Sequence, residues 1–167
     1  MLVPEYAIMD LVRTLGQGLP RFADGRIDYT DARVAPVVSA FVQSNEEVLL
    51  LKRSQKVGHY QGKWCGVAGY LDSTDQPPIA KVLEEVNEET GIRKAAISRV
   101  RFGENYSWRD GETNKSWIVY PALVKVSGKP RITLDEEHTE HAWIKPHELR
   151  KFETVPNLDT SLRNALS

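Results

Sequence analysis

Three glutamates near the middle of the chain have the spacing that brings side chains together on one face of a helix. They are Glu85, Glu88 and Glu89, within the segment 69–92. If residues 79–90 form a helix, the three glutamates lie at positions i, i+3 and i+4, so their carboxylates converge. Like charges this close repel each other, and Mg²⁺ or Mn²⁺ would relieve the repulsion because these ions prefer oxygen ligands. The spacing therefore predicts a metal site.

The elements around the glutamates indicate how they are positioned. A strand over residues 64–71 leads through a polar, proline-containing loop into a helix over residues 79–90, which Gly91 ends. The other face of this helix carries three apolar side chains, those of Val82, Leu83 and Val86. We therefore expect the helix to pack on a sheet while its glutamates face outward.

The remaining elements follow from apolar runs and turn residues. Runs over residues 35–42 and 48–52 flank a polar turn, which is typical of a hairpin. Further strands are predicted over residues 26–30, 99–108, 116–126 and 142–144, and further helices over residues 146–152 and 160–166, the last capped by Asp159. A short helix or strand is expected around residues 6–14. This alternation predicts an α/β (α+β) fold, a sandwich around a mixed sheet.

The bulk composition narrows the class of protein. At 167 residues the chain is long enough for one domain, and we expect residues 1–33 to form an N-terminal extension packed on a domain of residues 34–167. The net charge of −1 argues against a dedicated nucleic-acid or membrane-surface protein. Cys65 is the only cysteine, which excludes an intrachain disulfide. Because no signal peptide or apolar stretch of roughly 18 residues is present, we expect a cytoplasmic protein.

The strand, loop and helix resemble the Nudix box, G-x5-E-x7-R-E-U-x-E-E-x-G-U, in which U is an aliphatic residue. Residues 84–92 read EEVNEETGI and agree with six of the seven defined positions in the second half of the box. Gly69 and the residues before it, KWCGVA, are similar to the usual approach to the box. The resemblance extends from about Val34 through the C-terminal helices and implies a Nudix-type α/β/α sandwich around a mixed β-sheet.

Two departures from the box concern its scaffold. The arginine position holds Glu84, and the segment from Gly69 to Gly91 is one residue longer than the box. The first box glutamate then corresponds to Asp75 or Gln76. In the family, the box arginine helps to hold the loop and the helix together, typically through this acidic partner. If Gln76 is the equivalent, both members of the ion pair have changed together, which costs far less free energy than leaving one charged partner alone. We interpret the departure as altered scaffolding.

The resemblance implies a set of metal ligands and catalytic residues. The ion would be Mg²⁺ or Mn²⁺. Its ligands correspond to Glu85, Glu88, Glu89 and the backbone carbonyl of Ala68. A further carboxylate would come from the loop at residues 134–143, where Glu137 fits the family spacing best and Glu140 second. Either binds a metal or acts as base, or both are surface acids. The residues expected to catalyse are Glu88, Glu85 and Glu137.

The substrate contacts are expected in and after the basic run that precedes the box. Arg53, Lys56 and Lys63 are candidate phosphate contacts, Arg53 foremost because its guanidinium binds oxyanions bidentately, although such a run is also typical of a solvated loop. Tyr60 and Trp108 either stack on a base or belong to the core.

The resemblance implies hydrolysis of the diphosphate linkage in a nucleoside diphosphate bonded to another group X, by an enzyme that acts on phosphorus-containing acid anhydrides. The alternative is a non-catalytic nucleotide-binding or regulatory Nudix module, suggested by Glu84. A weaker one is the isoprenoid-diphosphate isomerase branch, whose catalytic cysteine sits in a different context from Cys65. The expected partner is a small nucleoside diphosphate derivative, and a homodimer that uses the N-terminal extension is a further hypothesis.

Overall fold

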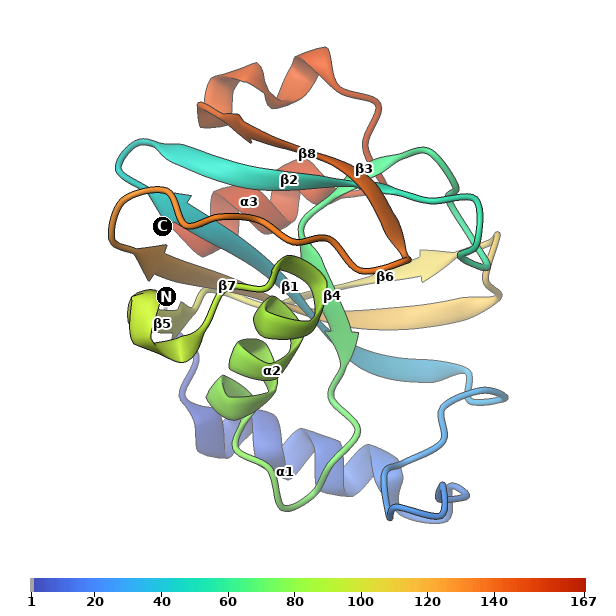
Figure 1. Ribbon diagram of the computed structural model, residues 1–167. Helices are drawn as coiled ribbons and strands as arrows, with labels where there is room; N and C mark the ends of the chain where they lie inside the picture. Colours follow the sequence, from blue (N-terminus) through green and yellow to red (C-terminus); the bar gives the residue numbers. More distant parts are fainter. Residues whose placement is uncertain (1) are drawn as a thin grey trace.

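The computed structural model describes residues 2–167, which form a mixed β-sheet with helices on both faces (Figure 1). The helices are α1 (Glu5–Gly16), α2 (Pro78–Thr90) and α3 (Leu158–Leu166), with the short 3-10 helices η1 (Lys94–Ala96) and η2 (Pro146–Lys151). The strands are β1 (Val34–Ser44), β2 (Glu47–Arg53), β3 (Trp64–Cys65), β4 (Val67–Tyr70), β5 (Ile97–Phe102), β6 (Tyr106–Asp110), β7 (Lys115–Val126) and β8 (His138–Ile144).

The sheet is mixed because one long parallel pair lies among antiparallel ones. Its order is β3-β2-β1-β7-β5, with β4 beside β1, β6 beside β7 and β8 beside β2. β1 and β7 run parallel, and every other pair is antiparallel. The predicted hairpin of β1 and β2 is confirmed at its turn, where Gln43 pairs with Val48. Beyond the turn, β2 continues beside β8 and β3 while β1 continues beside β7 and β4.

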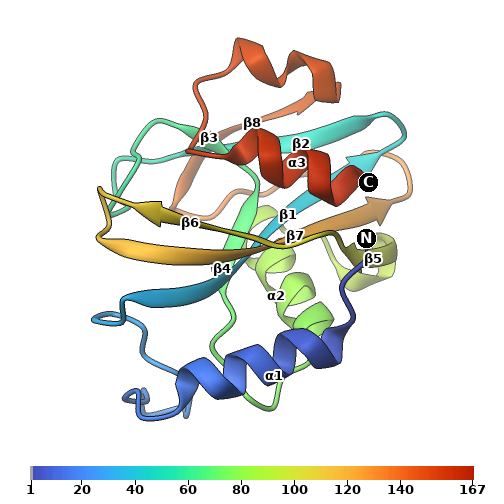
Figure 2. The same ribbon diagram turned by 180° about the vertical axis from the view of Figure 1, so that it is seen from behind.

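Helices cover the two faces of the sheet, and each face has its own core. α2 lies in front of the sheet in Figure 1, and α3 lies in front of it in the reversed view of Figure 2. Val82 and Val86 of α2 are fully buried with the side chains of β1 and β4, and α1 contributes Ile8 and Val12 to this core. On the other face, α3 packs its leucines against Phe41. The predicted α/β/α sandwich is confirmed.

Three predicted strands differ from the observed ones. Residues 26–30 were expected to be a strand, yet only Ile27 forms a bridge, because this segment bonds to the loop after β4 instead. Residues 64–71 divide into β3 and β4 because the chain changes its partner from β2 to β1 at Gly66. Residues 99–108 divide between β5 and β6, with a break at residues 103–105, and both strands pair with β7.

The helices follow the predictions more closely. Residues 6–14 lie in a helix, α1, and not in a strand. α3 begins at Leu158 after Asn157, whose φ of 63° is left-handed, so Asp159 lies in the first turn and is not the cap. Within residues 2–167, every helix is too short or too polar to cross a lipid bilayer.

Candidate active site

Helix α2 carries the glutamates and is anchored at both ends. Pro78 lies in its first turn, where backbone N–H groups have no partner within the helix, so proline loses no hydrogen bond there. The carboxylate of Glu5 accepts a hydrogen bond of 3.0 Å from the backbone N–H of Ile79. The helix ends at Gly91, whose φ of 74° is left-handed and therefore suits glycine. α1 of the N-terminal segment thus caps the helix that bears the predicted metal ligands.

The three glutamates of α2 differ in exposure. Glu85 is half-buried, Glu88 is exposed, and Glu89 is only 4% exposed. The prediction that all of them face outward is wrong, because Glu85 and Glu89 lie near the same face as Val82 and Val86. Burial raises the pKa of Glu89 well above its ordinary value, and the nearby carboxylates of Glu85 and Asp135 raise it further. Burial also raises the pKa of Glu85.

A second buried polar group lies against Glu89. His138 Nε2 is 3.5 Å from Glu89 Oε1, and its Nδ1 is 2.7 Å from Asp135 Oδ1. The Sγ atom of Cys65 is 3.8 Å from the same Nε2 atom. Burial raises the pKa of the Cys65 thiol to about 12, so the thiol stays protonated at neutral pH and is no nucleophile. Cys65 is a small buried side chain, as predicted.

The glycine that opens the predicted box lies directly beside Glu85. A Cβ atom added at Gly69 would stand 2.5 Å from Cδ of Glu85, so only glycine lets the carboxylate lie this close to β4. Ala68, the predicted carbonyl ligand, is the preceding residue, and both line the same cavity as Glu85. The strand and the helix therefore bring the box glycine, the predicted carbonyl and one predicted carboxylate together.

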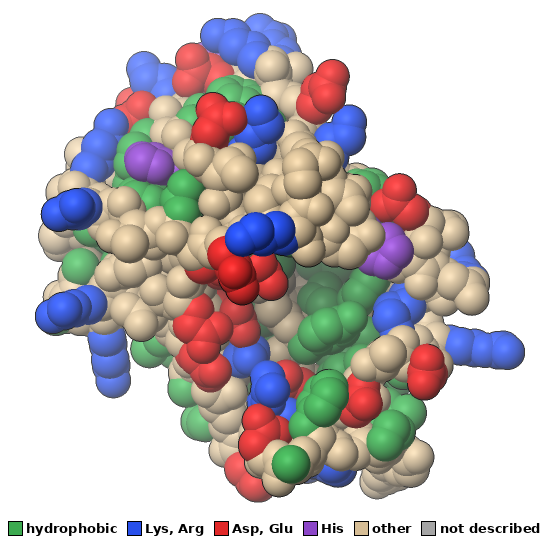
Figure 3. Space-filling view, turned by 45° about the vertical axis from the view of Figure 1, so that its right-hand side comes forward, with side chains coloured by type: hydrophobic (Ala, Val, Ile, Leu, Met, Phe, Trp, Pro, Cys, Tyr) green, Lys and Arg blue, Asp and Glu red, His purple; other side chains and the backbone are tan. Residues whose placement is uncertain are grey.

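This cavity has a volume of about 480 Å³, and Glu85 of α2 lies in its wall. Figure 3 shows a hollow whose floor is hydrophobic and along one edge of which acidic side chains gather. The lining includes residues from β1, β4, β6, β7 and the loop after β2. It combines charged groups with aromatic ones, as a site for a charged ligand with an aromatic part would.

Aromatic rings form one wall of the cavity. The rings of Tyr70 and Trp117 lie 5.9 Å apart, and Tyr29 stacks on Tyr70 at 5.5 Å. Asp110 holds two of the aromatic side chains in place. It accepts hydrogen bonds from the hydroxyl of Tyr60 at 2.7 Å and from Nε1 of Trp117 at 3.1 Å. Tyr60 and Trp117 therefore belong to one hydrogen-bonded unit.

Some predicted site residues line this cavity and others do not. Those that do are Glu85, Glu137, Ala68, Gly69, Arg53, Tyr60 and Trp108. Those that do not are Glu88, Glu89, Glu140, Lys56 and Lys63. Each of the two lysines pairs with a surface acid, Lys56 with Glu136 at 3.7 Å and Lys63 with Glu153 at 3.2 Å. Arg53 donates two hydrogen bonds to the carbonyl of His59.

Sequence reasoning missed four charged residues of the cavity: Arg26, Asp72, Lys81 and Asp110. The ammonium of Lys81 lies 2.8 Å from Oε1 of Glu85 and 3.6 Å from Oδ1 of Asp72. Nη1 of Arg26, in the N-terminal segment, lies 3.5 Å from Oδ2 of Asp72. Lys81 precedes Glu85 by four residues, so helical spacing could have paired them. Arg26 gave no local signal, because its contact depends on how the N-terminal segment folds back.

The two departures from the Nudix box meet in the structure. Nε2 of Gln76 donates a hydrogen bond of 2.6 Å to Oε2 of Glu84. Gln76, and not Asp75, therefore faces the residue at the arginine position. An amide–carboxylate hydrogen bond joins the loop to the helix here.

The donor set around Glu85 suits a hard divalent cation. Carboxylate and carbonyl oxygens are available, and burial together with neighbouring carboxylates raises the pKa values of Glu85 and Glu89. As they are placed, no three His, Cys, Asp or Glu side chains of residues 2–167 converge in a geometry that could hold an ion. Lys81 occupies the coordinating side of Glu85. The donor chemistry of these residues fits the ion, and the ammonium of Lys81 lies against one of the carboxylates that would bind it.

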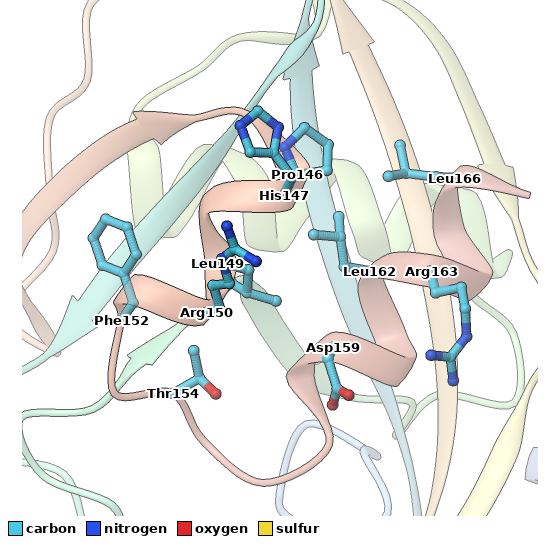
Figure 4. Close-up of a pocket in the computed structure, with 10 residues that line it drawn as sticks. All are labelled: Pro146, His147, Leu149, Arg150, Phe152, Thr154, Asp159, Leu162, Arg163 and Leu166. Carbon is cyan, nitrogen blue, oxygen red and sulfur yellow. The ribbon is translucent and has the colours of Figure 1, made fainter.

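A larger hollow of about 560 Å³ lies between η2 and α3, away from the glutamates (Figure 4). Its lining is mainly apolar, with Leu149, Phe152, Leu162 and Leu166, and Asp159 is its only acid. Because four acids line the cavity beside α2, namely Asp72, Glu85, Asp110 and Glu137, that cavity is the better candidate for chemistry.

Comparisons with known proteins identify the family of the chain. The model of the NUDIX domain matches residues 33–165. The nucleoside triphosphatase NudI of Escherichia fergusonii is 25% identical over 141 residues, which are 81% of this chain and 96% of that protein. The structure of a MutT protein from Methanosarcina mazei Go1 has 25% identity and a TM-score of 0.63, over 78% of this chain and 91% of that one.

A third relative covers nearly the whole chain. A bifunctional NMN adenylyltransferase/ADP ribose pyrophosphatase from Francisella tularensis has a TM-score of 0.64 at 16% identity, over 97% of this chain and 46% of that one. At that identity the likeness concerns the fold. The matched domain model shows that the chain belongs to the Nudix family. It is a hydrolase that acts on phosphorus-containing acid anhydrides.

Proposed function

We propose that this chain is a Mg²⁺- or Mn²⁺-dependent pyrophosphohydrolase that cleaves the diphosphate linkage of a nucleoside diphosphate bonded to another group X. The observation that carries the proposal is the pair of carboxylates on one face of α2, the half-buried Glu85 beside Gly69 and Ala68 and the buried Glu89 one turn further on. Buried like charges are unfavourable without a cation. A fold neighbour, the bifunctional enzyme from Francisella tularensis, was solved with AMP and a Mn ion.

The residues divide the chemistry among them. Glu85, Glu88, Glu89 and the carbonyl of Ala68 would hold the ion. A bound divalent ion supplies Lewis acidity, which neutralises charge that develops at phosphorus and makes water a stronger nucleophile. Glu88 is exposed and Glu137 lines the cavity, so either carboxylate can accept a proton from an attacking water.

The cavity supports a substrate with a charged part and an aromatic part. Arg53 and Arg26 line it and offer guanidinium groups to phosphate oxygens. Tyr70 is 38% exposed and lies beside Trp117, so the exposed part of this aromatic wall can contact a base. Lys56 and Lys63 stand outside this cavity and would contact only a substrate that extends beyond it.

A substrate panel tests the proposal. Purified protein is incubated with ADP-ribose, dinucleoside polyphosphates, nucleotide sugars and nucleoside triphosphates, with Mg²⁺, with Mn²⁺ or with a chelator. We expect phosphorus NMR to show cleavage of a diphosphate bond in at least one class, and only with metal. Absence of any phosphorus-containing product across the panel, with metal present, would count against a hydrolase.

The ion pair of Lys81 with Glu85 favours a second candidate, a nucleotide-binding module without turnover, because an ammonium already neutralises the carboxylate. Calorimetry separates the two candidates. A module binds nucleotide without turnover and binds it equally after Glu88→Gln. A hydrolase turns the substrate over and loses at least about 10²-fold in rate on that change while remaining folded.

A further inference from the structure

Lys81 is a buried cation in the middle of an acidic site. The residue is 5% exposed, and its ammonium lies between the carboxylates of Glu85 and Asp72. Burying a charge is costly unless it is well paired. Lys81 is therefore an internal counter-ion of the site.

The ammonium of Lys81 lies closer to one of its two carboxylate partners than to the other. The distance of 2.8 Å to Oε1 of Glu85 is that of a charge-assisted hydrogen bond. The distance of 3.6 Å to Oδ1 of Asp72 is too long for one. Within residues 2–167, Oδ1 of Asp72 is the buried side-chain oxygen or nitrogen left without a hydrogen-bond partner. A second acceptor thus lies next to the ammonium and is unsatisfied.

Lys81 and a divalent cation would compete for the same oxygen of Glu85. Both would occupy the coordinating side of Oε1, and two positive charges at that distance repel each other. The flexible four-carbon side chain of lysine allows its ammonium to shift between neighbouring acceptors. Asp72 offers such an acceptor, and Arg26 contacts only its other oxygen, Oδ2.

We propose that Lys81 holds Glu85 while the site is free of metal and moves to Oδ1 of Asp72 when Glu85 ligates a divalent cation. Lys81 is then a positioning residue that weakens metal binding at Glu85. The inference rests on the proposed function, since it takes Glu85 to be a metal ligand. It assigns Asp72 a role as the acceptor of the displaced ammonium.

Calorimetric titration with Mn²⁺, without substrate, tests the inference. We expect Lys81→Met to bind Mn²⁺ about tenfold more tightly than the natural protein, because no ammonium competes for Glu85. Lys151→Met is the matched control: it also removes one positive charge, but from a surface lysine paired with Glu148, and its affinity should stay within about twofold. A merely structural role for Lys81 predicts the opposite result, weaker binding, because α2 would be disturbed.

Asp72→Asn tests the second position of the ammonium. We expect it to weaken Mn²⁺ binding in the natural protein, where Lys81 loses its alternative acceptor, and to have a much smaller effect in the Lys81→Met background. This difference is the coupling that a double-mutant cycle measures. Equal effects of Asp72→Asn in the two backgrounds would overturn the transfer to Asp72.

Thermal unfolding supplies a second readout. Without metal, Lys81→Met should unfold at a lower temperature, since Glu85 loses its counter-ion, and Mn²⁺ should raise its midpoint more than that of the natural protein. If Lys81→Met does not fold, Lys81→Gln keeps a donor for Glu85 without the charge. Unchanged or weaker Mn²⁺ affinity in the folded variant overturns the inference and leaves the hydrolase proposal standing. Absence of Mn²⁺ and Mg²⁺ binding in every variant overturns both.

Discussion

At the scale of single residues, the glutamate triplet and its surroundings contributed differently to what could be predicted. Helical spacing alone brought Glu85, Glu88 and Glu89 together, and the structure places them on one helix. Their exposure was not predictable, because it depends on how α2 rotates against the sheet. Gln76 was one of two alternatives for the partner of Glu84, and their contact in space decides between the alternatives.

The pair of Gln76 and Glu84 leads to a prediction about scaffolding. Both side chains are exposed or partly exposed, so their hydrogen bond competes with water. We expect Gln76→Ala to lower the free energy of unfolding by about 0.5 kcal/mol, measured by urea denaturation, and to leave the hydrolysis rate within about twofold. A loss of rate far beyond this, without unfolding, would mean that the pair orders the site.

At the scale of elements, periodic patterns were predictable and changes of strand partner were not. The β1–β2 hairpin and α2 followed from runs of apolar residues and a terminal glycine. The break between β3 and β4 occurs because each strand pairs with a different neighbour, and that choice depends on segments far away in the chain. The local sequence therefore does not indicate which strand each segment will pair with.

The turn between β6 and β7 depends on one buried carboxylate. Asp110 is 2% exposed and accepts hydrogen bonds from Tyr60, Trp117 and the N–H of Glu112. Burial would raise the pKa of Asp110, but these hydrogen bonds lower it below the ordinary value of 3.8. A lowered pKa contributes stability above the ordinary value, and that stability is lost as the pH falls through the folded-state pKa.

We therefore expect Asp110→Asn to destabilise the protein by about 2 kcal/mol at neutral pH, because an amide replaces a charged acceptor. The difference from the natural protein should shrink as the pH falls below 3.8. Urea denaturation at a series of pH values measures it. A difference that stays constant down to strongly acidic pH would contradict this role for the Asp110 charge.

The ammonium of Lys115, in β7, binds three carbonyls of the N-terminal segment. Nζ of Lys115 donates hydrogen bonds to the carbonyls of Tyr29, Thr30 and Ala32, at 2.6, 3.0 and 2.7 Å. Lys115→Met keeps the length of the side chain but leaves these carbonyls without their donor. We expect it to lower the free energy of unfolding by about 2 kcal/mol. Lys125→Met, on an exposed position of the same strand, is the control, and equal effects of both would contradict the prediction.

At the scale of the whole molecule, the layers of the sandwich could be predicted, but the pairing of segments that are distant in the chain could not. Alternating strands and helices indicated the layers, while the parallel pairing of β1 with β7 joins segments far apart in the chain. The same holds for the N-terminal segment, whose Glu5 caps α2 and whose Arg26 reaches Asp72. The site is therefore made from distant parts of the chain. The sequence indicated Arg53, Tyr60, Trp108 and Glu137 as well as the glutamates of α2, but it gave no sign of the contacts made by the N-terminal segment.

The central claim is that the glutamates of α2 support metal-dependent cleavage of a diphosphate bond. The measurement that tests it most directly is the hydrolysis rate of the best panel substrate, by phosphorus NMR, for the natural protein and for Glu85→Gln, with Mn²⁺ and with a chelator. We predict turnover only with metal and a loss of at least about 10²-fold in the folded variant. Full activity of Glu85→Gln, or equal rates with and without metal, would contradict the claim.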